Sequence, residues 1–302
     1  MRILITGSNG VVGKEIAHLL GKDKKYKLVL FTNRKVKKSR KKIKSFYQDL
    51  TKTIDHKFKV DAIIHCAAKK PFYQNQIAKT GSNLRKLYLA NLKITKNLIK
   101  FSNENYVDKI IFLSAIKVYG TVKRKIVTEN LYPKNLDLYG KSKLRSEKIF
   151  GEKNNKFQTI SLRLPGVLDL CLSRNQPLIL NIIKKIINNK NIHAYNINSK
   201  FNNVVDIYEL VKLIKIILKR KKVKTSAYNI AASYPINFIS VVNLIKKVFK
   251  SESKIINKNS NKTSFIISNK KIKKDFNIKI STTKNIILRH CRKILNADYK
   301  VA

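Results

Sequence analysis

Short apolar runs alternate with longer amphipathic segments through the first half of the chain. Helical apolar spacing predicts helices over Val11 to Leu20, Leu84 to Phe101 and Leu138 to Phe150, the first of them closed by Gly21. The runs that predict buried strands are Arg2 to Thr6, Lys27 to Thr32, Ala62 to Cys66, Lys109 to Ser114 and Thr159 to Leu164. Strands that alternate with helices are typical of a parallel sheet covered on both faces, so the pattern predicts an α/β fold.

The alternation loosens after Pro165. Apolar spacing predicts helices over Leu178 to Asn188, Asp206 to Arg220 and Phe238 to Lys250, with a strand at Ala227 to Ala231. At 302 residues the chain is long enough for two lobes around one cleft. We expect residues 1–164 to form the first lobe, with 201–231 returning to it. Residues 165–200 and 232–302 are expected to form the second lobe.

The chain is strongly basic, with 66 Lys plus Arg against 17 Asp plus Glu and a formal net charge of +49. Charges of this size occur in nucleic-acid binders and in proteins that dock on anionic lipid. The lysines also fall on the polar faces of predicted helices, and lysine, asparagine and isoleucine are abundant together, which favours a general compositional bias. The densest basic run, Arg34 to Lys44, is a candidate anion-binding patch.

Signals for targeting or metal binding are missing from the sequence. The first predicted strand begins at Arg2, which leaves no room for a secretory signal, and no apolar stretch is long enough to cross a bilayer. Cys66, Cys171 and Cys291 are widely separated and show neither Cys-x-x-Cys spacing nor clustering with histidine. We therefore expect a cytoplasmic protein with reduced thiols, no transmembrane segment and no metal site.

The segment between the first predicted strand and helix is rich in glycine. It reads Thr6-Gly7-Ser8-Asn9-Gly10-Val11-Val12-Gly13. Glycine lets the backbone turn tightly and approach a pyrophosphate, and the following helix directs free N–H groups and its positive dipole end at the phosphate. The predicted dinucleotide-binding residues of this turn are Gly7, Asn9, Gly10, Val11, Val12 and Gly13.

Residues around the Ala62 to Cys66 strand offer further cofactor contacts. The small residues Ala67 and Ala68 follow the strand and would let a cofactor lie across the sheet edge. Asp49 and Leu50 precede it and are candidates to contact an adenine ring.

The end of the second predicted strand bears on the choice of cofactor. Asn33 and Arg34 lie there, with Lys35 beyond, and no acidic residue is present to bind a ribose 2′-hydroxyl. Basic residues at this place favour a 2′-phosphate, so we expect NADP slightly ahead of NAD.

Tyr139 and Lys143 lie four residues apart in a predicted helix, so both side chains project from one face. A phenol with a pKa near ~10 is a poor base at neutral pH. A nearby ammonium favours the phenolate and lowers that pKa, which lets the tyrosine exchange a proton with a hydroxyl or carbonyl. In so lysine-rich a chain this spacing also arises by chance, and its functional interpretation depends on the surrounding motifs.

Those motifs occur in one order with one spacing. They are the glycine turn, His65-Cys66-Ala67-Ala68, Asn91, Leu113-Ser114-Ala115-Ile116-Lys117-Val118-Tyr119-Gly120, Thr128-Glu129-Asn130, Tyr139-x-x-x-Lys143, Leu162-Arg163-Leu164-Pro165-Gly166-Val167 and Phe201-Asn202-Asn203-Val204-Val205-Asp206-Ile207. Together they resemble the extended short-chain dehydrogenase/reductase family, particularly its nucleotide-sugar epimerases, dehydratases and reductases.

The resemblance implies a Rossmann domain, with a doubly wound parallel sheet and a smaller C-terminal substrate-binding lobe, and a homodimer formed through the long helices. It implies Tyr139 as acid/base and Lys143 as its electrostatic partner, which also hydrogen-bonds the cofactor ribose. It adds Lys69, Asn91 and Pro165 to the cofactor contacts.

One position departs from the family's pattern. A catalytic Ser or Thr is expected four residues before Tyr119, and Ala115 stands there. Ser114 is one position earlier, but neighbouring strand residues point to opposite faces, so its use would require a local bulge. We take Ser114 as a candidate catalytic hydroxyl, with a structural role for it and the use of Ser142 or a substrate hydroxyl as alternatives. Removing one such donor costs about 2.7–4 kcal/mol of transition-state stabilisation.

Three functional hypotheses follow. The first is an NAD(P)-dependent epimerase, dehydratase or reductase acting on a nucleotide-linked sugar in cell-surface polysaccharide biosynthesis. The second is a catalytically impaired Rossmann protein that binds RNA or another polyanion, supported by the charge and by Ala115 but opposed by the retention of Tyr139 and Lys143. The third is peripheral docking on anionic membrane through Lys-rich amphipathic helices, which would suit a lipid-linked substrate.

Overall fold

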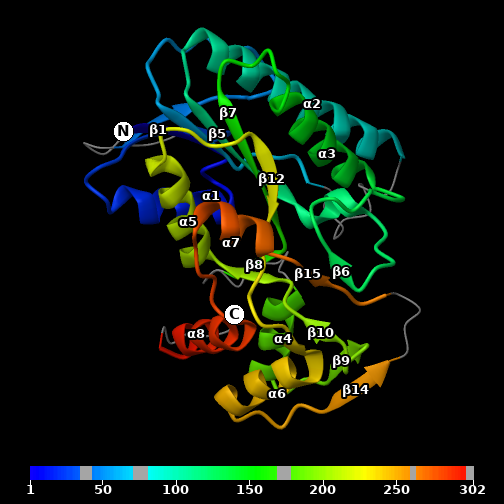
Figure 1. The fold of residues 1–302 in the computed structure, drawn as a ribbon. Helices are drawn as coiled ribbons and strands as arrows, with labels where there is room; N and C mark the ends of the chain where they lie inside the picture. The colour runs from blue at the N-terminus through cyan, green and yellow to red at the C-terminus, as the bar shows by residue number, and fades with distance from the viewer. Residues whose placement is uncertain (35–42, 71–80, 169–177, 259–262, 297–302) are drawn as a thin grey trace. The chain divides into compact units, whose positions relative to one another are not determined.

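The computed structural model of the protein describes residues 1–34, 43–70, 81–168, 178–258 and 263–296, and the chain divides into two compact units (Figure 1). Unit 1 comprises Met1–Thr121, Tyr132–Arg163 and Val211–Tyr228. Unit 2 comprises Val122–Leu131, Leu164–Leu210 and Asn229–Ala302. The segment that returns to unit 1 is thus shorter than the expected 201–231, and residues 122–131 lie in unit 2 instead of the first lobe.

Unit 1 is built on a seven-stranded sheet in the order β12-β7-β5-β4-β1-β2-β3. Its strands are β1 (Arg2–Thr6), β2 (Lys27–Thr32), β3 (Ile43–Tyr47), β4 (Ala62–His65), β5 (Lys109–Ala115), β7 (Gln158–Leu164) and β12 (Ser226–Asn229). The pairings that run from β3 through β2, β1 and β4 to β5 are parallel. The predicted α/β fold with a doubly wound parallel sheet is confirmed.

Helices cover both faces of this sheet. α2 (Gly81–Glu104) and α3 (Leu138–Phe150) pack together on one face, and α1 (Val11–Gly21) lies on the other (Figure 1). The core beneath α2 and α3 joins Leu4, Ile63 and Phe112 of the strands to Leu98 and Phe101 of α2. Residues on both faces of these central strands are buried, because helices cover the sheet on both sides.

Helix α5 (Ile207–Lys219) begins in unit 2 and ends in unit 1. Its carboxyl end is capped by Lys109 of β5, whose ammonium donates to the carbonyl oxygens of Ile217 at 3.0 Å and Arg220 at 2.5 Å. A cation is favoured at this end of a helix because the last carbonyl groups have no partner within the helix.

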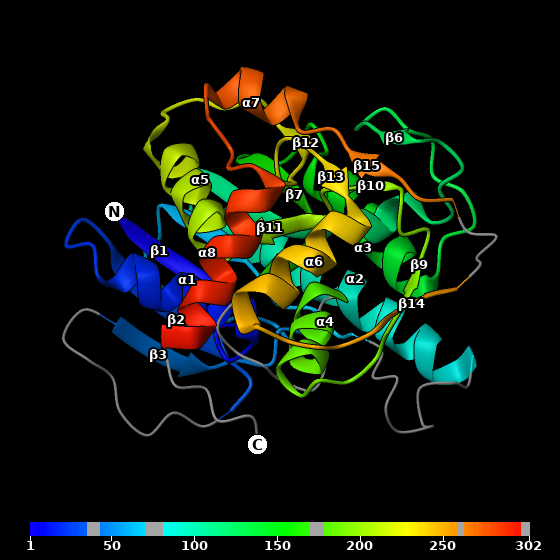
Figure 2. The ribbon, with the colours of Figure 1, turned by 90° about the horizontal axis from the view of Figure 1, so that it is seen from below.

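Unit 2 combines short strand pairs with a hydrophobic core of its own. β8 (Gly166–Leu168) pairs with β11 (Val204–Asp206), β9 (Ile192–Tyr195) with β14 (Ile255–Lys258), β6 (Ile126–Val127) with β15 (Ile266–Ile267), and β10 (Lys200–Phe201) with β13 (Ile236–Asn237). The core is formed by α4 (Leu178–Ile187), α6 (Phe238–Phe249) and α8 (Thr283–Asn296), visible together in Figure 2, and α7 (Lys270–Phe276) precedes α8. The pairing of β6 with β15 explains why residues 122–131 belong to this unit.

Three findings bear on the remaining expectations. Most of the basic run from Arg34 to Lys44, and also Cys171, lies outside the described residues, while Cys66 and Cys291 are free thiols. Strand β3 and helices α7 and α8 were not predicted. Within the described part of the chain, no helix has the length and apolar character needed to cross a bilayer.

Candidate active site

The glycine segment forms a tight turn between β1 and α1 in unit 1. Gly7 has a φ of 68°, and a Cβ added there would lie 2.7 Å from the Cα of Ala67. A Cβ at Gly13 would lie 2.3 Å from the carbonyl oxygen of Gly7, whereas one at Gly10 would lie 3.2 Å from it. Side chains cannot be accommodated at Gly7 and Gly13 without moving the backbone, so the shape of this turn depends on glycine.

The amino end of α1 suits an anion. Gly10 is the N-cap and supplies no capping side chain, and the first turn contains no acidic residue. Asn9, Gly10 and Val11 are exposed. Free N–H groups and the positive end of the helix dipole favour a phosphate here, and the bare glycine backbone allows close approach. The turn therefore fits the pyrophosphate of a dinucleotide.

The ends of β2 and β4 lie against this turn. The hydroxyl of Ser8 donates to the carbonyl oxygen of Phe31 in β2 at 3.3 Å. The backbone N–H of Ala67 donates to the hydroxyl of Thr6 at 3.4 Å, and that hydroxyl lies 2.7 Å from Nδ1 of His65. The carboxyl ends of three neighbouring strands are thus joined around the glycine turn, which is where open α/β sheets bind their ligands.

Asn91 of α2 links the segment after β4 to α3. Its Oδ1 accepts from the backbone N–H of Lys69 at 2.8 Å, and its Nδ2 donates to the carbonyl oxygen of Lys69 and to the Ser142 hydroxyl, both at 3.1 Å. Ser142 in turn donates to the carbonyl oxygen of Tyr139 at 2.8 Å. Both ends of the Asn91 amide are therefore held by protein groups. This side chain positions the segment after β4 against the helix that carries Tyr139, and its predicted contact with the cofactor stays a prediction.

The two candidate hydroxyls are both bound to protein partners. Ser142 has no exposed surface and joins Asn91 to Tyr139. The Ser114 hydroxyl is buried and donates to Oε1 of Glu147 at 2.5 Å. The expected catalytic use of Ser114 is therefore not supported by its geometry, which fits the structural alternative. Ala115 follows in extended conformation, with φ −146° and ψ 152°, while the Ser114 hydroxyl is directed at Glu147.

Tyr139 and Lys143 lie one turn apart near the start of α3. The helix is capped by Asp137, whose Oδ1 accepts from the N–H of Gly140 at 2.6 Å. Nζ of Lys143 lies 5.9 Å from the centre of the Tyr139 ring and donates to the carbonyl oxygen of Leu113 in β5 at 2.8 Å. The pair is thus anchored directly to the end of a central strand.

The pKa values of this pair are set mainly by burial. Burial raises the pKa of Tyr139 to about 12, and the Asp137 carboxylate adds to the rise. Burial also lowers the pKa of Lys143 to about 7, with a further lowering from Lys70. The expected lowering of the Tyr139 pKa by Lys143 is thus not produced by the protein's own groups, because burial raises this pKa and the charge that acts on it is the Asp137 carboxylate. At neutral pH the phenol can donate a proton, and Lys143 exchanges between ammonium and amine.

Two candidate adenine contacts also lie in unit 1. Asp49 accepts from the N–H and the hydroxyl of Thr51 at 2.9 and 2.8 Å, which lowers the pKa of its carboxyl. Leu50 is buried in the core beneath α2 and α3. The Asp49 carboxylate is thus fixed in its ionised form, and the Leu50 side chain belongs to the packing of the sheet.

The remaining candidates are dispersed. Asn33 and Arg34 are exposed at the end of β2, where the hydroxyl of Thr32 donates to the carbonyl oxygen of Arg34 at 2.6 Å. Lys35 lies outside the described residues. Pro165 follows β7 and belongs to unit 2, whereas the other predicted site residues belong to unit 1.

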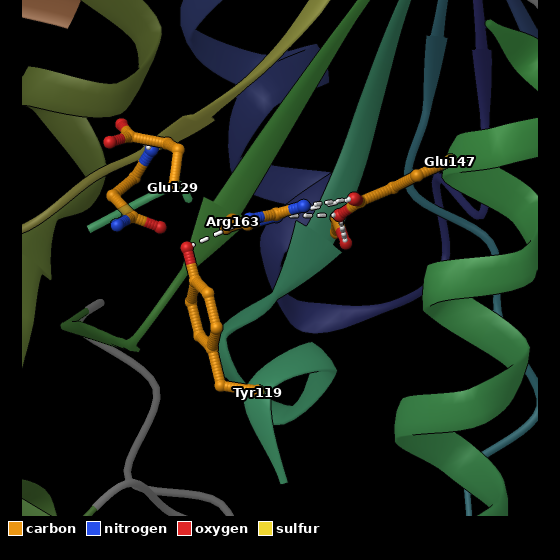
Figure 3. Close-up of polar contacts among 6 residues, drawn as sticks. Tyr119, Glu129, Glu147 and Arg163 are labelled. Carbon is orange, nitrogen blue, oxygen red and sulfur yellow. Dashed lines mark hydrogen bonds and ion pairs between the residues drawn. The ribbon is translucent and has the colours of Figure 1, made fainter. Parts of the chain in front are cut away.

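One set of buried polar residues was missed by the sequence analysis. Glu147 of α3, Arg163 of β7 and Tyr119 form a hydrogen-bonded group that also includes Ser114 (Figure 3). A signal for Glu147 was present, because it continues the four-residue spacing of Tyr139 and Lys143 along one helix face.

Comparisons with known proteins agree with this geometry. Residues 3–231 match the NAD dependent epimerase/dehydratase family. N-acetyl-alpha-D-glucosaminyl-diphospho-ditrans,octacis-undecaprenol 4-epimerase of Escherichia coli O157:H7 is 28% identical over 156 residues, 51% of this chain and 46% of that protein. The chain thus spans about half of the length of that relative. GDP-6-deoxy-D-talose 4-dehydrogenase of Aggregatibacter actinomycetemcomitans is 29% identical over 233 residues, 71% of this chain and 72% of that protein.

Solved structures share the fold. UDP-glucuronic acid 4-epimerase from Bacillus cereus, in complex with UDP-glucuronic acid and NAD, has a TM-score of 0.78 at 19% identity and covers 98% of this chain and 100% of its own. UDP-glucose 4-epimerase from Thermotoga maritima has a TM-score of 0.77 at 17% identity, with coverage of 98% and 100%. The family is NAD-dependent and the first of these structures holds NAD, so the expected preference for NADP finds no support. From the family match over residues 3–231 and the shared fold, we conclude that the chain belongs to the NAD dependent epimerase/dehydratase family.

Proposed function

We propose that the protein is an NAD-dependent epimerase, dehydratase or reductase that acts on a diphosphate-linked sugar, in which Tyr139 exchanges the proton and Lys143 supports it electrostatically. The reaction belongs to the synthesis of cell-surface polysaccharide. We also keep the homodimer implied by the resemblance as a proposal, which light scattering of the purified protein tests.

One observation carries this proposal: a path of contacts within unit 1 runs from the glycine turn to Tyr139. Gly7 lies against Ala67, Asn91 binds both backbone groups of Lys69 and the Ser142 hydroxyl, and Ser142 binds the Tyr139 backbone. A pyrophosphate at the amino end of α1 and a proton donor on α3 are therefore held in one framework, as hydride and proton exchange at one carbon requires.

The protein's groups suit the proton half of such a reaction. NAD, when bound, supplies a hydride acceptor. Because burial raises the pKa of Tyr139 to about 12, the phenol is its form at neutral pH: it gives a proton to a carbonyl oxygen and takes the hydroxyl proton back in the reverse step. The positive charge of a Lys143 ammonium acts against that rise in pKa. Because the Lys143 pKa is about 7, its ammonium form is present at and below neutral pH. Ala115 offers no hydroxyl to polarise the carbonyl, so Tyr139 and Lys143 carry this step without that donor.

The substrate class is proposed from the relatives. Their names include a GDP-linked deoxysugar dehydrogenase, GDP-L-colitose synthase, and a 4-epimerase of a sugar joined through a diphosphate to undecaprenol. The shared feature is a sugar on a diphosphate, with either a nucleoside or a polyprenol on the other side. The high positive charge of this chain favours the approach of such anionic substrates.

The test begins with calorimetric titration of the purified protein with NAD and, for comparison, NADP. The protein is then incubated with NAD and UDP-, GDP- and dTDP-sugars or a polyprenyl-diphosphate sugar, and products are identified by NMR and mass spectrometry. We expect NAD binding and conversion of at least one sugar.

Ala115 and the net charge favour a second candidate, an impaired Rossmann protein that binds RNA or another polyanion. It would bind RNA with an affinity that falls steeply as salt rises, and it would convert none of the sugars. That combination would reject the enzymatic proposal.

A further inference from the structure

A buried ion pair and its hydrogen bonds join four elements of unit 1, α3, β5, β7 and the short helix that follows β5, close to Tyr139 and Lys143. Nη2 of Arg163 in β7 donates to Oε2 of Glu147 in α3 at 2.7 Å, and its Nε lies 3.1 and 3.2 Å from the two carboxylate oxygens (Figure 3). Nη1 of Arg163 donates to the Tyr119 hydroxyl at 2.8 Å, and Ser114 of β5 donates to Oε1 of Glu147. Tyr119 ends the short helix η2 (Ile116–Tyr119) that follows β5.

The Glu147–Arg163 ion pair is buried, so its effect on stability depends on both charged partners being present. The Glu147 and Arg163 side chains are 6% and 10% exposed. A buried ion pair of this kind is weak evidence for stability, because a hydrophobic pair of similar volume often serves as well. Removal of one member of a buried ion pair, in contrast, is strongly destabilising. We therefore explain the presence of this ion pair by the geometry that it fixes, a role that buried ion pairs have in some proteins.

The geometry in question is that of Lys143. Lys143 and Glu147 lie one turn apart on α3 and bind consecutive residues of β5, the carbonyl oxygen of Leu113 and the hydroxyl of Ser114. α3 is thus fixed to the strand end at two successive turns. Arg163 holds the second of these points and fixes it to β7 and to η2. Any shift of Glu147 along β5 would move Lys143 with it, and Tyr139 one turn further.

We propose that Glu147 and Arg163 are positioning residues for the Tyr139–Lys143 pair, holding α3 in register with the end of β5. This proposal rests on the proposed function of Tyr139 and Lys143. The charged and titratable groups that face Lys143 are His65, Cys66 and Lys70 at and beyond the end of β4, and Tyr139 and Glu147 on its own helix. The Glu147 carboxylate favours the charged form of Lys143, whereas Lys70 opposes it.

The test compares Glu147→Gln, the neutral pair Glu147→Gln with Arg163→Gln, and Arg163→Lys. The single Glu147→Gln variant removes the carboxylate that Arg163 binds and is expected to be destabilised. The neutral pair contains no lone charge, and Arg163→Lys keeps the ion pair without its two-point geometry. Glu152→Gln, which removes an exposed carboxylate just beyond α3, is the matched control. Thermal unfolding, kcat and KM for the sugar, and hydrogen exchange of residues 109–119 are measured for each.

We expect the neutral pair to fold with a kcat about 100-fold lower, because displacements of about 1 Å have effects of that size. Its KM should stay within about threefold of wild type, with faster exchange in residues 109–119, and Arg163→Lys should fall between wild type and the neutral pair. In any Glu147→Gln variant that folds, the alkaline limb of the pH–kcat profile should move to lower pH, because the Lys143 ammonium loses its anion.

Unchanged kcat and exchange in a folded neutral pair would overturn the proposal, since the ion pair would then be structural only. Should the neutral pair not fold, unchanged kcat and exchange in Arg163→Lys would overturn it equally. If wild type and Glu152→Gln convert no sugar at all, the proposed function fails, and exchange at residues 109–119 alone decides whether the pair holds the end of β5.

Discussion

Placing a hydroxyl at position 115 should raise catalytic activity. Ala115 has extended backbone angles that serine adopts without strain, and its side chain is half-buried, so one oxygen can be added. It directly precedes η2, which lies against the start of α3: a Cβ on Gly140 would come within 2.3 Å of the Lys117 carbonyl oxygen. The new hydroxyl would thus sit at the strand end nearest the turn that carries Tyr139.

The expected size of this effect follows from the loss seen when such donors are removed. One donor is typically worth about 2.7–4 kcal/mol, or roughly 100- to 1000-fold in kcat. A hydroxyl introduced without evolved supporting contacts recovers only part of this, so we expect Ala115→Ser to raise kcat at least tenfold, about 1.4 kcal/mol. Folding stability should change by less than about 0.5 kcal/mol, because no buried group loses a partner.

Initial rates with the best sugar substrate, together with NAD titration and thermal unfolding, measure this outcome. Ser114→Ala is the matched control for folding stability at the neighbouring position. It removes a hydroxyl that binds Glu147, so its free energy of unfolding should be about 1–3 kcal/mol lower than that of wild type. A folded Ala115→Ser variant with unchanged kcat and normal NAD affinity would refute the reasoning, since position 115 would then not face the reacting carbon.

Three further predictions concern the cofactor turn and the stability of the fold. Gly13→Ala should abolish NAD binding in calorimetry, because its Cβ would lie 2.3 Å from the Gly7 carbonyl oxygen; affinity within threefold of wild type would contradict this. Lys109→Met should lower the free energy of unfolding in urea by about 2 kcal/mol, because two hydrogen bonds to the end of α5 are lost, and no change would refute the capping role. Burial lowers the pKa of His290 from 6.5 to about 4, so the unfolded chain binds its proton more tightly and stability falls as pH drops from 6.5 towards 4. In urea titrations across this pH range, the free energy of unfolding of His290→Leu should fall by about 3 kcal/mol less than that of wild type. An identical pH dependence in the two proteins would contradict the lowered pKa of His290.

Local patterns predicted much of unit 1. Helix α3 was predicted with its observed bounds, because its apolar spacing lies within its own sequence; the structure adds Asp137 as its N-cap and Gly151 as its C-cap. The glycine turn was also predictable, since its residue types are dictated by backbone geometry at Gly7 and Gly13. Strand β3 was missed because its identity depends on pairing with β2 and not on its own alternation.

The details of the site depend on long-range contacts that no local pattern contains. Ser114 follows the alternation rule, but its partner Glu147 is 33 positions away, and Asn91 joins segments 22 and 51 positions distant. The Tyr139 pKa was predicted in the wrong direction because spacing reveals a neighbouring lysine but not the burial that dominates. The division into units was shifted for a similar reason, since β6 pairs with the distant β15.

The proposed exchange of a proton by Tyr139, in an NAD-dependent reaction of a diphosphate-linked sugar, is best tested with Tyr139→Phe. The variant keeps the ring and removes only the hydroxyl, and NAD affinity and sugar conversion are measured on the same preparation beside wild type. We expect NAD affinity within about threefold of wild type and conversion reduced by at least 100-fold, the order expected for loss of a general acid–base group. Conversion by Tyr139→Phe at the wild-type rate would contradict the proposed role of the phenol.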